Sequence, residues 1–319
     1  MLDLNQKNTW IIVEEKLTGT KNQCLAVSLQ LGIENPRIIN AELKFPWKQI
    51  SPYILPDCSF MFKKNNLFEP YPNLIIAAGR KSIAIARYIK KESPKTFVCF
   101  LQNPKTNNHN FDLIAAPEHD DIHGSNIIST LGTPNLIADK LIEEESNIYV
   151  DKVNNLSDNK IAFIIGGNSK THKMTESITN KICDDIISLS NNYGVMITTS
   201  RRTGNKNNKI IKDRLSNIEN IFLWDGENEN PYFSFLYHAD YIVVTNDSAS
   251  MISEAASTGK PVYLYPLEGG SKKFNRLYSN FKNSGAVRDF SKNIEKFNYP
   301  KLNDAKTISD EIKKKLNYP

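Results

Sequence analysis

Two adjacent arginines, Arg201 and Arg202, stand among hydroxyl side chains in the segment Thr198–Gly204, directly after a run that predicts a buried strand. A guanidinium binds two phosphate oxygens at once through parallel N–H donors. In parallel α/β sheets, ligands bind just beyond the carboxyl ends of the strands. The segment therefore predicts a phosphate site, although a solvated surface loop is the plainer alternative. Its candidate ligand-binding residues are Thr199, Ser200, Arg201 and Arg202.

The strand predicted over Tyr241–Thr245 leads into a second candidate site. Asp247 or Ser248 can cap the helix that follows, and the first turn of that helix presents free N–H groups and the positive end of its dipole. Ser250 and Glu254 lie four residues apart and therefore share one face of this helix. We expect Ser250 beside a phosphate and Glu254 beside ribose hydroxyls; an ordinary capped helix with a solvated Glu254 is the alternative.

Gly166 and Gly167 follow the predicted strand Lys160–Ile165. Without a Cβ, they allow the backbone to approach a phosphate or a sugar closely. The stretch is neither a dinucleotide fingerprint nor a P-loop, because Gly-x-Gly-x-x-Gly is absent and Ser169-Lys170-Thr171 has no glycine before its lysine. The pair therefore predicts a close backbone approach without defining the ligand.

In the first half of the chain, the segment Pro117–Gly124 gathers acidic residues and two histidines after a predicted strand. Glu118, His119 or Asp120 could act there as a general acid or base, and histidine is the commoner choice near neutral pH. A turn rich in helix-capping acids explains the segment equally well. The histidines lack the spacing and the third ligand of a metal site, so no metal is predicted. Glu14–Gln23 and Ala78–Arg80 are two further segments at strand ends.

The elements that must position these residues follow from the alternation of short apolar runs with helical patterns, which predicts parallel α/β units. In the first half, we expect strands at Trp10–Val13, Leu74–Ala77, Thr96–Leu101, Leu113–Ala115 and Asn126–Ser129, and helices at Gln23–Leu31, Ser82–Lys91 and Asn135–Glu145. In the second half, the expected strands are Lys160–Ile165, Val195–Thr198, Asn220–Leu223, Tyr241–Thr245 and Val262–Tyr265. The helices expected there are Met174–Ser190, Asn208–Leu215, Tyr232–His238, Ser248–Thr258, Lys273–Ser284 and Asp304–Leu316.

The length of 319 residues suggests two domains, and the polar, weakly periodic segment Ser146–Asn159 is the expected linker. We place the domains at residues 1–150 and 151–303, followed by a C-terminal helix at 304–319. Hydrophobic residues make up 40% of the chain, which is enough for two sizeable cores.

The charge and the composition exclude several classes of protein. The formal charge of +5 lies entirely in residues 151–319, which carry 24 basic and 19 acidic side chains against 16 of each in residues 1–150. That basic surface is too sparse for a general nucleic-acid binder. No apolar run approaches the ~20 residues that span a bilayer, and the polar start is not a secretory signal. The four cysteines have no metal-type spacing, so we expect reduced thiols and a cytoplasmic protein.

Taken in order along the chain, the motifs resemble those of the mitochondrial fission "elongated mitochondria" family, which occurs in plants and in many bacteria. The motifs are Asn22-Gln23, Ala78-Gly79-Arg80, Phe111-Asp112-Leu113 with Pro117-Glu118-His119-Asp120, Gly166-Gly167, Thr199-Ser-Arg-Arg-Thr203, Asn230-Pro231-Tyr232, Asp247-Ser248 with Ser250-Met251 and Ser253-Glu254-Ala255, and Gly259-Lys260-Pro261-Val262. They cover nearly the whole chain, so the resemblance is specific.

This family is similar to GT-B glycosyltransferases and nucleotide-sugar 2-epimerases. The resemblance therefore implies two Rossmann-like, doubly wound α/β domains that face each other, with the C-terminal helix returning to the first. The C-terminal domain would hold a nucleotide-sugar and the N-terminal domain its acceptor. Trp224, which follows a predicted strand, is a candidate to flank the base, and a purely structural tryptophan is an equal alternative. The other positions with an implied substrate-binding role are Gly19, Asn22, Gln23, Gly79, Arg80, Thr245, Asp247, Ser248 and Met251.

One departure from the family pattern bears on catalysis. Thr20 stands where the first loop of the family usually has a histidine, and Glu15 and Lys16 replace its Asp-Gly. If that histidine is the catalytic base in the relatives, the chemistry falls here to Glu15, Glu118 or His119.

We therefore predict a metal-independent, glycosyltransferase-like protein that binds a UDP-, GDP- or ADP-linked sugar and requires no cofactor. Two other classes stay open: a non-catalytic adaptor, because the plant member brings a dynamin-related protein to the mitochondrial surface, and an epimerase-like enzyme. The expected partners are the nucleotide-sugar and an unidentified acceptor, with no nucleic acid. A peripheral membrane association stays open, and a dynamin-related partner applies only to the plant-type role.

Overall fold

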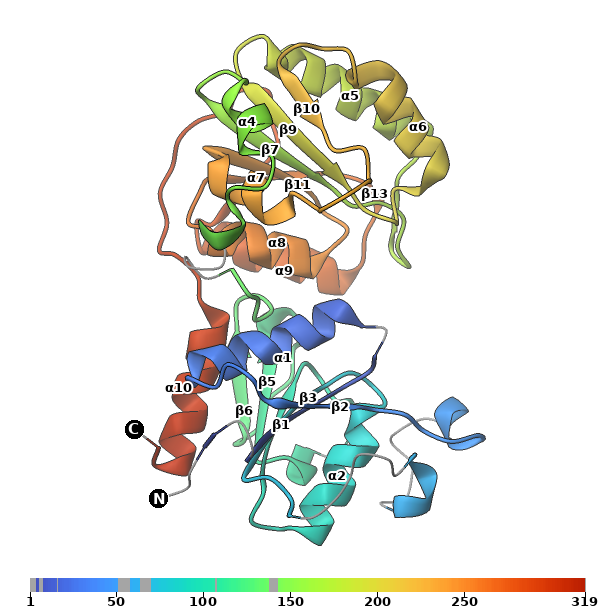
Figure 1. The fold of residues 1–319 in the computed structure, drawn as a ribbon, viewed down its shortest axis with the longest axis vertical. Coiled ribbons are helices and arrows are strands. Elements are labelled where there is room, and N and C mark those ends of the chain that lie inside the picture. Colours follow the sequence, from blue (N-terminus) through green and yellow to red (C-terminus); the bar gives the residue numbers. More distant parts are fainter. Residues whose placement is uncertain are drawn as a thin grey trace. The chain divides into compact units, whose positions relative to one another are not determined.

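A computed structural model describes residues 4–5, 8–15, 17–50, 58–63, 70–106, 108–137 and 143–318 (Figure 1). The chain forms two compact units, one made of residues 1–136 and 303–319 and the other of residues 137–302. Each unit is built on a six-stranded parallel sheet flanked by helices. This confirms the predicted α/β class with two Rossmann-like domains.

The first unit has the strand order β2-β1-β3-β4-β5-β6. Its strands are β1 (Thr9–Val13), β2 (Arg37–Asn40), β3 (Leu74–Ala78), β4 (Phe97–Leu101), β5 (Leu113–Pro117) and β6 (Ile127–Thr130). Its helices are α1 (Thr18–Gln30), α2 (Ser82–Glu92) and α10 (Asp304–Leu316), with short 3₁₀ turns that include η5 (Glu118–Asp120). Alternate residues of β1 face opposite layers. Trp10 and Ile12 pack on the α2 side, whereas Ile11 and Val13 pack on the side of α1 and α10.

The second unit has the strand order β10-β9-β7-β11-β12-β14. Its strands are β7 (Lys160–Ile165), β9 (Gly194–Thr199), β10 (Ile221–Leu223), β11 (Tyr241–Thr245), β12 (Val262–Tyr265) and β14 (Val287–Asp289), and β8 (His172–Lys173) pairs with β13 (Glu268–Gly269). Its helices are α4 (Val150–Asn154), α5 (Glu176–Ser190), α6 (Gly204–Leu215), α7 (Tyr232–His238), α8 (Ala249–Ser257) and α9 (Lys272–Asn283). The chain order reverses at β7, between β9 and β11, and this is where ligands of open parallel sheets bind.

Two elements of the first unit differ from the sequence predictions. Helix α1 begins at Thr18 and not at Gln23, because its first turn is exposed and leaves no apolar periodicity to recognise. Gly19, Asn22 and Gln23 therefore lie on a helix and not on a loop. Strand β2 was missed because three of its four residues are exposed at the edge of the sheet. The helix predicted at Asn135–Glu145 falls largely outside the described residues.

The predicted linker Ser146–Asn159 is part of the second unit. It contains α4, and the carbonyl oxygen of Ser146 accepts hydrogen bonds from Ser234 Oγ at 3.1 Å and from His238 Nε2 at 2.9 Å. These contacts tie the segment to α7, so the two units part at residue 136 rather than at 150. Strand β14, with only three residues, was also missed.

Helix α10 is anchored to the first unit by a buried carboxylate. Asp304 is 8% exposed, and its two oxygens accept hydrogen bonds from the backbone N–H groups of Leu131 at 3.1 Å and Gly132 at 3.0 Å. Burial raises the pKa of this carboxyl, and the two N–H donors oppose that rise. Further along the helix, Ile308 and Ile312 pack into the same core as α1. Helix α10 thus completes the core of the first unit, although it lies far from the rest of that unit in the sequence.

We expect Asp304→Ala to lower the free energy of unfolding of the first unit by about 2–3 kcal/mol, because it leaves two backbone donors without an acceptor. Asp310→Ala is the matched control, since Asp310 is 54% exposed and pairs with Lys306; exposed pairs are worth less than ~1 kcal/mol. Urea unfolding followed by Trp10 and Trp47 fluorescence, in a Trp224→Phe background, reports on the first unit alone. Equal losses in the two variants would contradict this role of Asp304.

Candidate functional site

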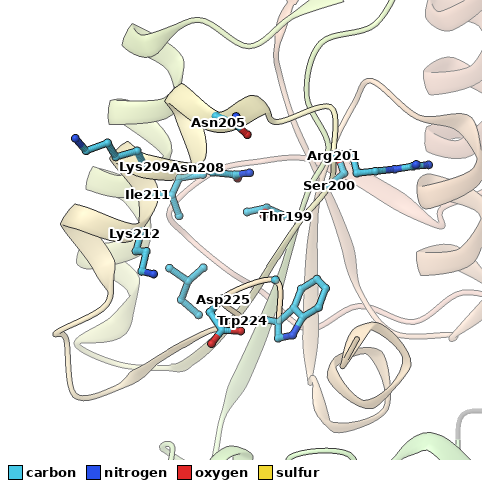
Figure 2. Close-up of a pocket in the computed structure, with 12 residues that line it drawn as sticks. Thr199, Ser200, Arg201, Asn205, Asn208, Lys209, Ile211, Lys212, Trp224 and Asp225 are labelled. Atoms are coloured by element: carbon cyan, nitrogen blue, oxygen red, sulfur yellow. The ribbon is translucent and has the colours of Figure 1, made fainter. Parts of the chain in front are cut away.

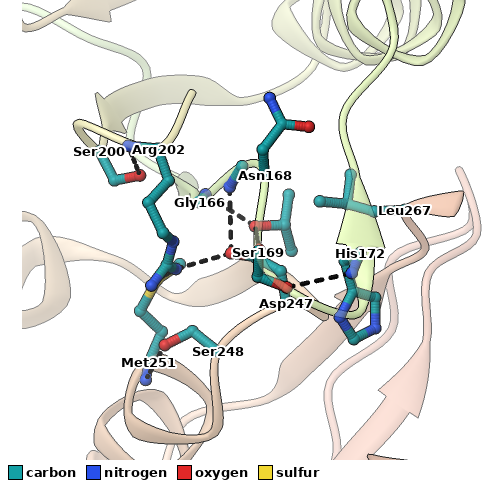
Figure 3. Close-up of polar contacts among 12 residues, drawn as sticks. Gly166, Asn168, Ser169, His172, Ser200, Arg202, Asp247, Ser248, Met251 and Leu267 are labelled. Carbon is teal, nitrogen blue, oxygen red and sulfur yellow. Dashed lines mark hydrogen bonds and ion pairs between the residues drawn. The ribbon is translucent and has the colours of Figure 1, made fainter. Parts of the chain in front are cut away.

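A buried aspartate joins three strand ends at the carboxyl edge of the second sheet (Figure 3). Asp247 Oδ2 accepts a hydrogen bond from Gly167 N at 3.0 Å and pairs with the guanidinium of Arg202 at 2.6 Å. Asp247 Oδ1 accepts a hydrogen bond from the hydroxyl of Thr245 at 2.6 Å. The donors come from the segments that follow β7 and β9 and from the end of β11. One carboxylate therefore fixes these three segments relative to one another.

The two glycines after β7 make room for protein groups. A Cβ at Gly166 would lie 2.3 Å from both carboxylate oxygens of Asp247, and a Cβ at Gly167 would lie 2.2 Å from the carbonyl oxygen of Arg202. Their N–H groups are also used internally, since Gly166 donates to Thr245 Oγ1 at 2.7 Å and Gly167 donates to Asp247. The close approach expected from the sequence is present, but its partners are Asp247 and Arg202.

The segment after β9 sends its two arginines to different places. The guanidinium of Arg202 pairs with Asp247 and lies 3.8 Å from the sulfur of Met251. The hydroxyl of Thr203 donates to the carbonyl oxygen of Gly166, which fastens this segment to the glycine pair. Arg201 is exposed, and its side chain extends outward (Figure 2). Of the two predicted phosphate ligands, only Arg201 has an uncommitted guanidinium among the described residues.

Helix α8 begins at the same edge of the sheet. Ser248, and not Asp247, is its N-cap, because the Ser248 hydroxyl accepts a hydrogen bond from Met251 N at 3.4 Å. The first N–H groups of a helix have no acceptor within the helix, and the dipole places partial positive charge there. Ser250 lies in this first turn and adds a hydroxyl. The start of α8 is thus the part of the edge that is best suited to an anion.

One turn further along α8, Glu254 is paired with a tyrosine from the start of α7. The hydroxyl of Tyr232 donates to Glu254 Oε2 at 2.5 Å. Burial raises the pKa of Glu254 to about 7, and the hydrogen bond from Tyr232 works against this rise. Burial also raises the pKa of Tyr232 well above its usual value. Glu254 is therefore not the solvated surface residue of the alternative interpretation, and it can carry a proton near neutral pH.

His172, which the sequence reasoning did not select, fixes the far side of the glycine segment. The hydroxyl of Tyr278 donates to the carbonyl oxygen of Asn246 at 2.6 Å, so it accepts from His172 Nε2 at 2.8 Å. His172 Nδ1 is then the acceptor for the hydroxyl of Thr171 at 2.9 Å. Burial lowers the pKa of His172, in keeping with a neutral ring. The only signal in the sequence was a histidine five residues after the glycine pair.

A cavity of about 450 Å³ lies between α6 and the ends of β9 and β10 (Figure 2). Thr199, Ser200, Arg201 and Trp224 all line it. The indole N–H of Trp224 donates to the carbonyl oxygen of Glu227 at 2.8 Å, which fixes the ring. The structure thus groups the predicted residues of the second unit in three places. These are the Asp247 cluster with Gly166, Gly167, Arg202, Thr245 and Met251; the start of α8 with Ser248, Ser250 and Glu254; and this cavity.

In the first unit, the carboxylate that lines a cavity beyond β1 is that of Glu14 and not that of Glu15. A cavity of about 260 Å³ is lined by Glu14, Leu43, Lys48, Ile50, Arg80 and Lys81. Glu14 Oε1 accepts a hydrogen bond from Lys81 N at 3.1 Å, and Glu14 Oε2 pairs with Lys81 Nζ at 2.7 Å. Arg80 donates to the carbonyl oxygen of Ile50 at 3.0 Å, and Gly79 lies against Glu14. Glu14 is the first residue after β1. Because ligands of parallel sheets bind at the strand ends, this position could have identified Glu14 from the sequence.

The other predicted residues of the first unit are scattered. Glu15 and Gly19 are exposed, and Gln23 is buried and accepts a hydrogen bond from Gln102 Nε2 at 2.8 Å. Glu118 is exposed in η5, whereas His119 beside it is only 3% exposed. Two strands, β3 and β4, separate β1 from β5. At about 4.8 Å per strand, Glu15 and Glu118 follow strands roughly 14 Å apart, so they do not form one acid/base pair.

Neither a metal centre nor a bilayer span is visible in the part of the chain that the structure describes. No three His, Cys, Asp or Glu side chains gather there in a way that could hold a metal ion. Within the same residues, no helix combines the length and the apolar character needed to cross a bilayer.

Comparison with known protein families shows which family this chain belongs to. Residues 18–316 match the family described as mitochondrial fission ELM1. The chain belongs to this family. It is 27% identical to the mitochondrial fission protein ELM1 of Arabidopsis thaliana over 273 residues, which is 77% of this chain and 64% of that protein. It is also 27% identical to an uncharacterized protein of Rickettsia prowazekii, over 96% of this chain and 98% of that one.

Solved structures show that this ELM1-family chain has the fold of GT-B glycosyltransferases and epimerases. The UDP-GlcNAc 2-epimerase of Methanocaldococcus jannaschii superposes with a TM-score of 0.64 at 15% identity, covering 99% of this chain and 100% of that chain. MurG of Acinetobacter baumannii superposes with a TM-score of 0.51 at 13% identity, covering 97% and 90%. Identities this low establish the fold alone.

The raised pKa of Glu254 predicts a pH effect on stability. Between its usual value of 4.5 and about 7, the folded chain keeps a proton that the unfolded chain has lost. Raising the pH through this window therefore lowers the free energy of unfolding. Glu254→Gln removes that dependence, so its stability relative to the unmodified chain should rise from pH 5 to pH 8 in urea unfolding. Tyr232→Phe should enlarge the fall, because it removes the bond that favours the ionised carboxyl. Parallel profiles for all three proteins would disprove the assignment.

Proposed function

We propose that this chain binds a nucleotide-sugar at the carboxyl edge of the second sheet and transfers the glycosyl group to an acceptor. The observation that carries the proposal is the start of α8, where free N–H groups, Ser250 and Glu254 lie directly after the Asp247 cluster. This edge is the switch point of the sheet, next to β7 and β11. Two structures of the same fold support the ligand class, since they were solved with UDP-GlcNAc and UDP and with UDP.

In the proposed complex, each group on α8 has a distinct role. The first-turn N–H groups and the hydroxyl of Ser250 bind the diphosphate, and the outward guanidinium of Arg201 neutralises part of its charge. Glu254 accepts a hydrogen bond from a ribose hydroxyl in place of the one from Tyr232. Arg202, Gly166, Gly167 and Thr245 act through Asp247, because their polar groups are spent on holding the edge together.

The proposed transfer needs no metal for its charge balance. The bond between the anomeric carbon and the diphosphate oxygen breaks, and the diphosphate leaves with the electron pair. A bond forms between that carbon and the acceptor oxygen, whose proton passes to a base. Helix N–H groups and Arg201 stabilise the charge on the leaving group. For the base, the first unit offers the exposed carboxylates Glu15 and Glu118 and the cavity residue Glu14, whereas the ring of His119 is buried.

A second candidate function is that of an adaptor without catalysis. The relative from Arabidopsis thaliana is named a mitochondrial fission protein, and Thr20 stands where the family pattern has a histidine. An epimerase-like reaction is the third candidate, because several proteins of this fold are named UDP-GlcNAc 2-epimerases. Binding of a nucleotide-sugar separates the adaptor from the two enzymes, and the reaction product separates the two enzymes from each other.

Binding tests the proposal directly. We expect one of UDP-GlcNAc, GDP-mannose and ADP-glucose to raise the unfolding temperature and to bind in calorimetry. Glu254→Ala and Arg201→Ala should each weaken this binding by about 10-fold or more, since the first removes a hydrogen bond to the ribose and the second removes a charged partner of the diphosphate. Glu229→Ala, a change in an exposed loop, serves as the control. If no nucleotide-sugar binds, the donor site is wrong and the adaptor is favoured. Binding without turnover on any acceptor would indicate a protein that has kept the site and lost the reaction.

A further inference from the structure

The two most exposed large apolar side chains among the described residues lie in one segment of the first unit, between β2 and β3. Phe45 is 72% exposed and Phe60 is 55% exposed, and no other described side chain of this kind exceeds 45%. The half-buried ring of Trp47 packs against that of Phe60 at a centroid distance of 5.6 Å. These three residues, Phe45, Trp47 and Phe60, form the aromatic tip. A single exposed apolar residue is ordinary, but a group of exposed rings marks an interaction surface.

A short antiparallel contact holds the aromatic tip in place. Leu43 and Phe62 form a β-bridge, and both side chains are buried in the core that α2 covers. Phe45 and Phe60 each lie two residues from this bridge, on the same side of it. In Figure 1 the segment that follows β2 extends away from the sheet of the first unit. The buried bridge therefore fixes the position from which both rings reach solvent.

Cations flank the aromatic tip. Lys44 precedes Phe45 in the sequence and Lys48 follows Trp47; both lysines are exposed, and neither has an ion-pair partner among the described residues. Arg80 is also exposed, and it lines the cavity of about 260 Å³ together with Lys48. The apolar rings are therefore next to positive charges that the fold leaves uncompensated.

The carboxylates of this region do not cancel its positive charge. Glu42 pairs with Lys63 at 2.7 Å, and Glu14 pairs with Lys81 at 2.7 Å. Glu15 is close enough to Lys63 to raise the pKa of that lysine. Five cations against three carboxylates give the described residues of the region a formal charge of +2. The cations are Lys44, Lys48, Lys63, Arg80 and Lys81, and the carboxylates are Glu14, Glu15 and Glu42.

Exposed aromatic rings beside uncompensated cations match the chemistry of an anionic bilayer surface. The headgroup region of a bilayer accepts aromatic rings, and anionic lipids attract lysine and arginine side chains. Rings on a projecting tip can enter between lipids, whereas a protein partner would have to provide a matching hollow. We propose that the first unit docks on a bilayer of anionic phospholipids through the aromatic tip. Phe45 and Phe60 insert between the headgroups, and Lys44 and Lys48 pair with lipid phosphates.

Sedimentation of the full chain with vesicles tests the insertion of the rings. The chain should bind vesicles of phosphatidylcholine mixed with phosphatidylglycerol, and it should bind phosphatidylcholine alone about tenfold more weakly. Phe45→Ser and Phe60→Ser should each lower the partition coefficient about tenfold, because each removes an apolar ring from the interface. Leu29→Ser is the matched control, since Leu29 is an exposed apolar residue at the end of α1, near the opposite edge of the sheet. It should change the partition coefficient less than about twofold.

A charge series tests the pairing with lipid phosphates. Lys44→Gln combined with Lys48→Gln should weaken binding to the anionic vesicles by about 10- to 30-fold and remove most of the preference over phosphatidylcholine. Lys91→Gln combined with Lys95→Gln makes the same change in charge. It is the control, because these exposed lysines lie where α2 ends and β4 begins, at the opposite edge of the sheet. Its effect should be clearly smaller.

Trp47 reports directly on contact with the bilayer. A brominated lipid quenches the fluorescence of a tryptophan that reaches the headgroup region, so the emission of the unmodified chain should fall when it binds. Trp47→Phe should keep the binding and abolish the quenching.

Four results would overturn the proposal. They are the absence of binding to anionic vesicles, equal binding to phosphatidylcholine alone, equal effects of Leu29→Ser and Phe45→Ser, and quenching that persists in Trp47→Phe. A dimer that Phe45→Ser abolishes, without any vesicle binding, would show that the aromatic tip pairs two copies of the chain instead. Glu254→Ala should leave vesicle binding unchanged, so this surface and the proposed nucleotide site can fail separately.

Discussion

The carboxylate of Asp247 imposes the constraint on which the rest of the second unit depends. A fully buried carboxylate is tolerated only if a cation and hydrogen-bond donors surround it. Here those donors are the Arg202 guanidinium, Gly167 N–H and the Thr245 hydroxyl, which come from three different segments. Each segment is therefore held within hydrogen-bonding distance of a single carboxylate. Because Ser248 follows directly as the N-cap, the same contacts fix where α8 begins and where its N–H groups lie.

This constraint also explains why two glycines follow β7. Each is needed because a Cβ would overlap Asp247 or the carbonyl oxygen of Arg202. A glycine in a sequence shows that something approaches the backbone closely, but it cannot show what approaches. The sequence interpretation left that space to a phosphate or a sugar, and the structure fills it with Asp247 and the backbone of Arg202. The ligand-facing groups then have to be sought one step further out, on α8.

The accuracy of the predicted element bounds depends on the length and the burial of each element. Strands β7, β11 and β12 and helices α7 and α10 match the sequence predictions residue for residue, because apolar runs bounded by turn residues mark them clearly. The start of α1 and the edge strands β2 and β14 lack that contrast, since they are exposed or very short. Glu14 and Glu15 show the limit for sites: neighbouring residues at a strand end point to opposite sides, and the sequence did not show that Glu14 is the one that lines a cavity.

The electrostatics of the second unit are consistent with an anion at the start of α8. Asp247 adds no net charge there, because Arg202 neutralises it within the fold. Glu254 lies one turn further along, and an ionised carboxylate so close to a diphosphate would repel it. Burial has already raised the pKa of Glu254 to about 7, so at neutral pH much of it is protonated. An arriving diphosphate would raise that pKa further and draw in a proton. The same side chain that appears repulsive in the sequence would then approach the ligand as a neutral hydrogen-bonding group.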